Sequence, residues 1–273
     1  MMGGHHAATG AAAWVAVTST APFAFGWYEG VSDTGVLAGA LVCAGAALLP
    51  DADHHSGTIA NALSPVSNWV VKVVETVSGG HRKGTHSILG VVVFTAIAWL
   101  LSFVRVDTGI EGIGTVQVGP GILCVLLVAF ALKALKITRD TKILPWTTSV
   151  VLAALIAVFA PEEWFWMPFC VALGCVVHNL GDFITTNGVP WFWPLKFRSP
   201  RWARDGKGII ELTSFWKRNG SLAMPILGNA GSVREWIFLI PVSLYAVVGI
   251  VWALLSQMGY YPQGFWNQVF GIA

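Results

Sequence analysis

Histidine and aspartate residues gather in three short polar stretches of an otherwise apolar chain. These stretches are LLPDADHH at Leu48–His55, HRKGTHS at His81–Ser87 and HNLGDFITTNG at His178–Gly188. His178 and Asp182 are four residues apart, so a helix that continues through both places them on one face. Imidazole and carboxylate groups at such spacings are common metal ligands in proteins. The three stretches therefore predict a metal site.

The candidate ligand set contains no thiolate. The cysteines lie inside apolar runs without a CxxC pair, and we interpret them as small buried hydrophobic residues: Cys43, Cys124, Cys170 and Cys175. Imidazole with carboxylate favours Zn²⁺, leaves Mn²⁺ and Fe²⁺ as alternatives, and disfavours Ca²⁺. The number of candidate ligands predicts more than one ion. For His5, His54 and His55, a structural or solvated role is as consistent with the sequence as metal binding.

Membrane helices are the elements expected to position these clusters. Hydrophobic residues make up 55% of the 273 residues and charged residues 11%, and the mean hydropathy is +0.66, which is too apolar for a soluble domain. Seven apolar runs approach the roughly 20 residues that cross a bilayer. They are residues 10–27, 34–49, 88–104, 119–135, 144–160, 164–180 and 236–256. We therefore predict an all-α fold, a single membrane-embedded domain over 1–273 with about seven transmembrane helices. The short break at 160–163 requires a tight helical hairpin.

The distribution of charge predicts how the chain is oriented. Lysine and arginine mark cytoplasmic loops of membrane proteins. If the N-terminus is cytoplasmic, Arg105 is the one basic residue that falls outside. The opposite loops then carry acidic residues, namely Glu29, Asp33, Asp107, Glu111, Glu162 and Glu163. The sequence thus predicts a multi-pass protein of the inner membrane with all seven histidines at the cytoplasmic face.

Two of the cytoplasmic loops are predicted to contact the lipid bilayer. Ser64 and Pro65 form a helix start, and apolar residues recur at helical spacing from Val66 to Val77. This pattern indicates an amphipathic helix in the membrane interface or, equally, a helix packed on the inner ends of the spans. The loop from Trp191 to Glu235 interleaves eight basic residues with aromatic ones, which suits anionic lipid head groups but also agrees with ordinary positive-inside bias. No nucleic-acid partner is expected.

The polar blocks resemble those of a known family. LPDADH, HRKGTHS and H-x3-D-x2-T-x2-G, followed by Pro194, are similar in type and order to signature blocks of the bacterial LexA-regulated, membrane-bound metal-dependent hydrolases, and H-x3-G at 6–10 resembles the opening block. The later GSVREW, with Glu235, is a looser match. That family is itself similar to zinc-dependent phospholipases C, helical enzymes that hold several zinc ions with histidine and aspartate. The resemblance implies these metal ligands: His6, Asp51, Asp53, His81, His86, His178 and Asp182.

The expected chemistry is metal-assisted hydrolysis of a phosphoester. We assign Arg82, Asp53 and Thr85 to the catalytic group, with Arg82 as a clamp for the substrate phosphate. Thr85 and Thr185 are expected to orient ligands through hydrogen bonds. A site at the inner membrane face favours a lipid or lipid-linked phosphate as substrate.

Two other functions remain open from the sequence. A divalent-cation transporter would also cluster histidine and aspartate, although near the bilayer midplane. A non-catalytic membrane protein could hold a structural metal in closed coordination.

Overall fold

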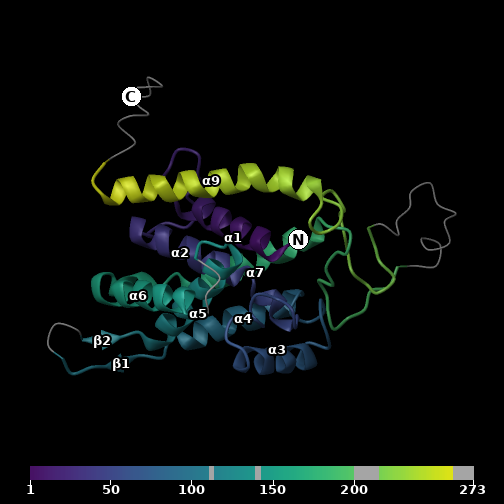
Figure 1. The fold of residues 1–273 in the computed structure, drawn as a ribbon, viewed down its shortest axis with the longest axis horizontal. Coiled ribbons are helices and arrows are strands. Elements are labelled where there is room, and N and C mark those ends of the chain that lie inside the picture. The colour runs from purple at the N-terminus through teal and green to yellow at the C-terminus, as the bar shows by residue number, and fades with distance from the viewer. Residues whose placement is uncertain (111–113, 139–142, 200–214, 261–273) are drawn as a thin grey trace, which may run out of the picture.

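The computed structural model describes residues 1–110, 114–138, 143–199 and 215–260 as a mostly helical bundle (Figure 1). The helices are α1 Gly3–Thr18, α2 Asp33–Ala46, η1 Leu49–Asp53, α3 Val66–Val77, α4 Ile88–Leu101, α5 Val118–Ala134, α6 Leu144–Phe159, η2 Pro161–Trp164, α7 Met167–Phe183 and α9 Val233–Gln257. A short antiparallel ribbon joins α4 to α5, with β1 (Val106–Asp107) paired to β2 (Thr115–Val116). The predominance of helices agrees with the predicted all-α fold.

Helix α2 forms the centre of the bundle, where it packs against α1, α5, α7 and α9. Glycine permits two of these contacts. A Cβ atom on Gly45 would lie 1.9 Å from the carbonyl oxygen of Leu127 in α5, and one on Gly10 would lie 2.6 Å from that of Cys43. Small residues at such contacts let helix backbones approach closely, as in membrane bundles. All four cysteines are buried and free, as interpreted from the sequence.

Within the described part of the chain, two helical segments are long and apolar enough to cross a membrane by length and composition. They are Asp33–Asp53, which joins α2 to η1, and Val233–Gln257. Four shorter apolar helices accompany them, at Ile88–Leu101, Val118–Ala134, Leu144–Val158 and Met167–Phe183. The predicted number of seven spans is therefore not confirmed. Large apolar side chains are nevertheless exposed along α4, α6 and α9, and such surfaces suit contact with hydrocarbon better than with water.

The first predicted span differs from the helix that forms. The sequence predicts one span over residues 10–27, but α1 covers Gly3–Thr18. The chain then folds back, because Phe25 N–H donates to the Ala16 carbonyl at 2.7 Å and Tyr28 N–H to that of Val17 at 2.9 Å. Pro22 and Gly26 favour this turn, since proline cannot donate a backbone hydrogen bond and Gly26 has a φ of +61°.

The predicted hairpin at residues 160–163 also takes another form. Helices α6 and α7 are joined by η2, yet α6 packs mainly against α5, whereas α7 packs against α4, α2 and α1. The two helices therefore do not form the tight antiparallel pair that the short break suggested.

Helix α3 has the predicted bounds, and most of its apolar face is exposed. Val71 and Ser67 are buried, and the Ser67 hydroxyl donates to the Ala60 carbonyl at 2.6 Å. The large apolar side chains of Trp69 and Val77 are instead exposed. The helix thus packs on the bundle through a narrow strip that includes Ser67, and it leaves most of its apolar face uncovered. Figure 1 shows α3 on the side of the bundle opposite α9.

The alternating helix directions bring the three polar stretches to one end of the bundle. Helix α5 ends there, since Lys133 Nζ donates to the Asn61 carbonyl at 3.0 Å. Helices α4 and α7 both contact η1, and α9 starts beside the first residues of α1. At the opposite end, the last turn of α9 reaches the start of α2, where Gln257 donates to Thr34 at 2.7 Å. Several charged residues of the predicted loops lie outside the described residues: Glu111, Arg139, Lys142, Arg201, Arg204, Asp205, Lys207 and Glu211.

Candidate metal centre

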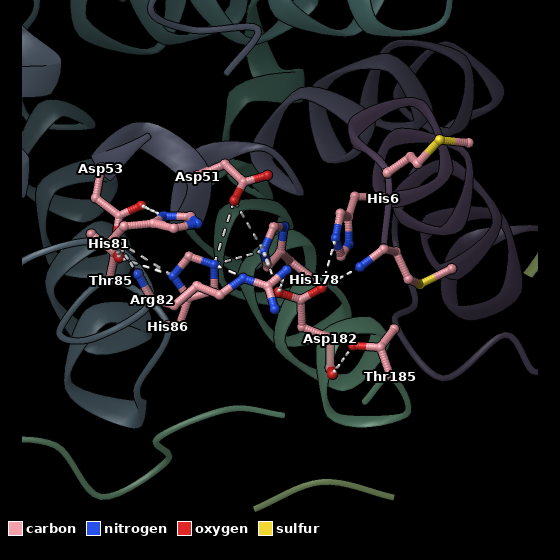
Figure 2. A network of polar contacts seen from close by, with 12 residues as sticks. His6, Asp51, Asp53, His81, Arg82, Thr85, His86, His178, Asp182 and Thr185 are labelled. Atoms are coloured by element: carbon pink, nitrogen blue, oxygen red, sulfur yellow. Dashed lines mark hydrogen bonds and ion pairs between the residues drawn. The ribbon is translucent and has the colours of Figure 1, made fainter. Parts of the chain in front are cut away.

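All seven residues implied as metal ligands meet at this end of the bundle (Figure 2). They come from four parts of the chain: the first turns of α1, the 3-10 turn η1, the loop between α3 and α4, and the last two turns of α7. The structure groups them as His6 with His178 and Asp182, Asp51 with His86 and His178, and Asp51 with Asp53 and His81; within each group, the ligand atoms lie within 4.8 Å of one another.

Local sequence explains how each ligand reaches the centre. Pro50 prevents α2 from continuing as a regular α-helix, because proline lacks a backbone donor and its ring crowds the preceding turn. It lies instead in the 3-10 turn η1, which also carries Asp51 and Asp53. Ser87 caps α4 by accepting from Gly90 N–H at 3.1 Å. This cap fixes the neighbouring His86. Helix α7 continues to Phe183, as the spacing of the third polar stretch required.

The tautomer of His178 is set by a backbone group. Its Nδ1 lies 2.7 Å from the carbonyl oxygen of Ala47, at the end of α2. A carbonyl can only accept, so Nδ1 carries the proton and neutral His178 presents its Nε2 lone pair to the centre. A second hydrogen bond of this kind is the usual way in which a protein orients a metal-binding imidazole.

The tautomer of His86 follows from a chain of two hydrogen bonds. The Thr85 hydroxyl lies 2.6 Å from Asp53 Oδ2 and 3.1 Å from His86 Nδ1. The carboxylate can only accept, so Thr85 donates its one proton to Asp53 and accepts from His86 Nδ1–H. Neutral His86 therefore also points an Nε2 lone pair at the centre, 3.2 Å from His178 Nε2.

The Nε2 atoms of His86 and His178 lie close to the carboxylates of Asp51 and Asp182 in the interior of the protein. Asp51 Oδ1 lies 3.5 Å and Asp182 Oδ2 lies 3.8 Å from His86 Nε2. Four electron-rich atoms this close repel one another unless a cation or a proton lies between them. Burial alone would lower the pKa of His86, but the carboxylates of Asp51 and Asp53 outweigh burial and raise this pKa to about 9. The centre thus attracts positive charge strongly.

His6 and Asp182 form the most enclosed part of the centre. The His6 ring stacks on that of His178 with centroids 3.7 Å apart, and its Nδ1 is buried without a hydrogen-bond partner. Its Nε2 lies 3.2 Å from Asp182 Oδ1, which the Met1 amine also contacts. A buried polar atom without a partner costs about 1–3 kcal/mol. A metal ion would provide that partner for His6, so the residues present fit a bound cation.

The Asp53 carboxylate accepts several hydrogen bonds from the 81–85 loop in addition to facing the centre. Its Oδ2 accepts from Arg82 N–H at 2.9 Å as well as from Thr85, and its Oδ1 lies 2.8 Å from His81 Nδ1. Three of about four acceptor positions on the carboxylate are thus in use. Asp53 therefore orients His81 and the 81–85 loop, and it retains one position for a cation.

Arg82 joins the two halves of the centre. Its φ of +55° is a strained backbone conformation for a residue with a side chain, and it lets the backbone N–H bind Asp53 while the guanidinium pairs with Asp182 Oδ2 at 2.9 Å. From the sequence, we predicted that Arg82 binds the substrate phosphate, and we did not predict its ion pair with Asp182. The other terminal nitrogen, Nη1, is buried and has no hydrogen-bond partner, so one donor of the fork remains available.

One side of the centre is open to a cavity of about 270 Å³. The side chains of Asp51, His81 and Arg82 are 25%, 36% and 22% exposed, whereas His6, His86, His178 and Asp182 are buried. The cavity also has His54, Ser56 and Thr58 in its wall. A ligand can thus reach the centre through this cavity, past Asp51, His81 and Arg82.

The remaining histidines lie at the periphery. His54 lines the cavity and its ring lies 4.4 Å from that of His81, centroid to centroid, while the exposed His55 belongs to none of the three ligand groups. His5 contacts Glu235 through Nδ1. Thr185 donates to the Asp182 backbone carbonyl at 2.7 Å, so it supports the end of α7 rather than a carboxylate.

Sequence reasoning gave too little weight to Glu235. This buried carboxylate accepts from Met2 N–H at 2.9 Å and Gly231 N–H at 2.8 Å in addition to its contact with His5. It ties the start of α9 to the first turn of α1 and so positions His6. The available signal was Ser232-x-x-Glu235 at a helix start, a capping-box pattern, with Glu235 N–H 3.3 Å from Ser232 Oγ.

Comparison with known proteins identifies a family. Residues 1–256 match the YdjM inner membrane protein family, a range that contains every residue of the centre. No curated protein and no solved structure matches the chain significantly. The family match agrees with the apolar composition and with the exposed apolar helix faces. The chain therefore belongs to the YdjM inner membrane protein family.

Proposed function

We propose that the protein is a membrane-embedded, metal-dependent hydrolase of a phosphoester. The observation that carries this proposal is the convergence of two imidazole lone pairs and two carboxylates next to an open cavity. A purely structural metal site would enclose its ion completely. Here one edge of the ligand set faces the cavity, where a substrate oxygen could approach.

The ligand groups favour a centre that would hold two ions. His178 has one free nitrogen, because its Nδ1 is engaged by Ala47, so it can serve a single ion. Asp51 belongs to two of the ligand groups and has two oxygens. One ion would then be held on the side of His86 and His178, and the other on the side of Asp53 and His81. The mixed nitrogen and oxygen donors suit Zn²⁺, with Mn²⁺ or Fe²⁺ as alternatives.

The roles of the protein's own groups follow from their contacts. Bound divalent cations would neutralise charge on phosphoryl oxygens and make a water more acidic. Arg82 keeps Nη2 on Asp182 and offers Nη1 to a phosphate oxygen. Thr85 holds His86 in the binding tautomer, and Asp53 holds His81.

The position of the centre favours a substrate at the membrane surface. It lies at one end of the bundle, where α3 packs beside η1 and leaves most of its own apolar face exposed. We infer that this end is cytoplasmic, that the chain crosses the membrane several times, and that the substrate is a lipid or lipid-linked phosphate. Ligands at a bundle end are not what a cation transporter requires, since such sites lie near the bilayer midplane.

The test is metal content and turnover measured together. Protein purified in detergent should bind close to two equivalents of Zn²⁺ or Mn²⁺ and hydrolyse phosphoesters from a panel of lipid phosphates. His178→Ala should lose both properties, while the matched variant His55→Ala keeps them, because His55 belongs to no ligand group. Metal-loaded parent protein that hydrolyses no phosphoester, but carries metal into sealed vesicles, would instead establish transport.

A further inference from the structure

A second pocket lies beside the metal centre and is lined by positive charge. It has a volume of about 400 Å³ and is formed by the turn at Lys83, the segment 190–198 and the turn at 218–220. Four of its lining side chains are cationic: Lys83, Lys196, Arg198 and Arg218. No acidic side chain among the described residues lines it.

Backbone hydrogen bonds and an aromatic ring hold the three segments together. Leu222 and Val189 exchange hydrogen bonds of 2.8 and 3.0 Å, and Trp216 Nε1 donates to the Phe197 carbonyl at 2.6 Å. The ring of Trp193 packs so close to Gly84 that a Cβ atom there would lie 3.1 Å from Cζ3. The shape of the pocket is therefore fixed by contacts between the segments that line it.

The charges in this pocket are not compensated within the described part of the protein. None of the four cationic side chains forms a salt bridge with a described carboxylate; Lys83 donates to the Gly79 carbonyl, which leaves two of its three ammonium protons free. All four side chains are exposed, and four cations around one hollow create a positive potential that attracts an anion. The pocket thus has the charge of an anion site.

We propose that this pocket binds a phosphate group. Two arginine forks can each bind phosphate oxygens in pairs, and the two lysines add point charges. Trp193 and Leu195 form an apolar wall at the same place, which suits a phosphate that is attached to an apolar body at a membrane interface. The site is separate from the metal centre, because Arg82 lines the metal cavity whereas the next residue, Lys83, lines this pocket.

The proposal is tested by counting bound anions on matched charge variants. Arg198→Gln with Arg218→Gln removes two cations from the pocket, and Lys72→Gln with Arg234→Gln removes two exposed cations elsewhere. Native mass spectrometry of metal-stripped protein would measure binding of phosphatidylglycerol, phosphatidylcholine and inorganic phosphate. We expect the pocket variant to bind its preferred phosphate about 30-fold more weakly, at roughly a fivefold loss per cation near a membrane surface, and the control to match the parent.

Each outcome has a defined meaning. Binding of phospholipid but not inorganic phosphate identifies a lipid head group as the source, and the reverse pattern identifies a soluble phosphate; either supports the site. Equal binding by the pocket variant and the parent, or an equal loss in the control, would overturn it. Metal content, measured on the protein before stripping, should be unchanged in the pocket variant, so a failed hydrolase proposal and a failed anion site remain distinguishable.

Discussion

Replacement of Thr85 by valine should weaken metal binding without removing a ligand. Valine has almost the same shape as threonine, but it lacks the hydroxyl that donates to Asp53 at 2.6 Å and accepts from His86 Nδ1 at 3.1 Å. Without this acceptor, His86 is free to carry its proton on Nε2, the atom that faces His178. The lone pair needed by a cation would then be absent for part of the time.

The size of the effect can be worked from the two lost contacts. Groups that orient metal ligands typically contribute a factor of about 10 to 100 in affinity, or about 1.4–2.8 kcal/mol. The lost hydrogen bond to the Asp53 carboxylate alone is worth about 1.5–3 kcal/mol. We therefore expect Thr85→Val to bind Zn²⁺ about 10-fold to 100-fold more weakly, measured by competition with a chelating dye in detergent.

Two controls separate this effect from general damage. Thr85→Ser keeps the hydroxyl and should retain most of the affinity. Thr95→Val removes a hydroxyl that bonds only to the Val91 carbonyl within α4, and it should leave zinc binding unchanged. Parental affinity in Thr85→Val would refute the assigned tautomer of His86 and, with it, the argument for converging lone pairs.

Four further predictions address the centre and its setting. His178→Ala should remove most bound zinc and His55→Ala almost none, by elemental analysis. Zinc affinity should rise about tenfold per pH unit between about pH 6.5 and 9, because binding displaces the His86 proton, whose pKa is raised to about 9; a flat profile would contradict this. In the metal-free protein, that proton stabilises the fold fully below pH 6.5, and the stabilisation should fade as pH rises through 9, as followed by thermal unfolding. Arg82→Lys should keep its metal but lose turnover by roughly 30-fold to 1,000-fold.

The sequence was informative wherever chemistry and spacing are local. The four-residue spacing of His178 and Asp182 correctly predicted a shared helix face, and the valine pattern correctly predicted α3. Long-range partners could not be predicted in this way. The Arg82–Asp182 ion pair and the contact of His5 with Glu235 join residues that are far apart in the chain, and they exist because helix packing brings those ends together.

The number of spans shows a different limit. Apolar composition indicates helices, but it does not determine where each helix stops. The turn after Thr18 depends on backbone hydrogen bonds that reach back to Ala16 and Val17, and apolar residues on both sides of it hide the boundary. Composition also cannot show which face of α3 packs inward. The polar Ser67 lies on the buried side because its hydroxyl finds a long-range acceptor, the Ala60 carbonyl, and the sequence does not reveal that contact.

The break after α2 has a consequence for how this centre could change over evolution. The last carbonyls of a helix lack partners within it, and His178 uses one of them, that of Ala47. A backbone acceptor is present whatever side chain occupies position 47, so no point mutation there deletes the group that sets the His178 tautomer. Substitutions at position 47 should thus be limited only by the room available for a larger side chain at this buried position. Loss of Pro50 is the more dangerous change, because a helix that continued past it would recapture the carbonyl and move Asp51 in the same step.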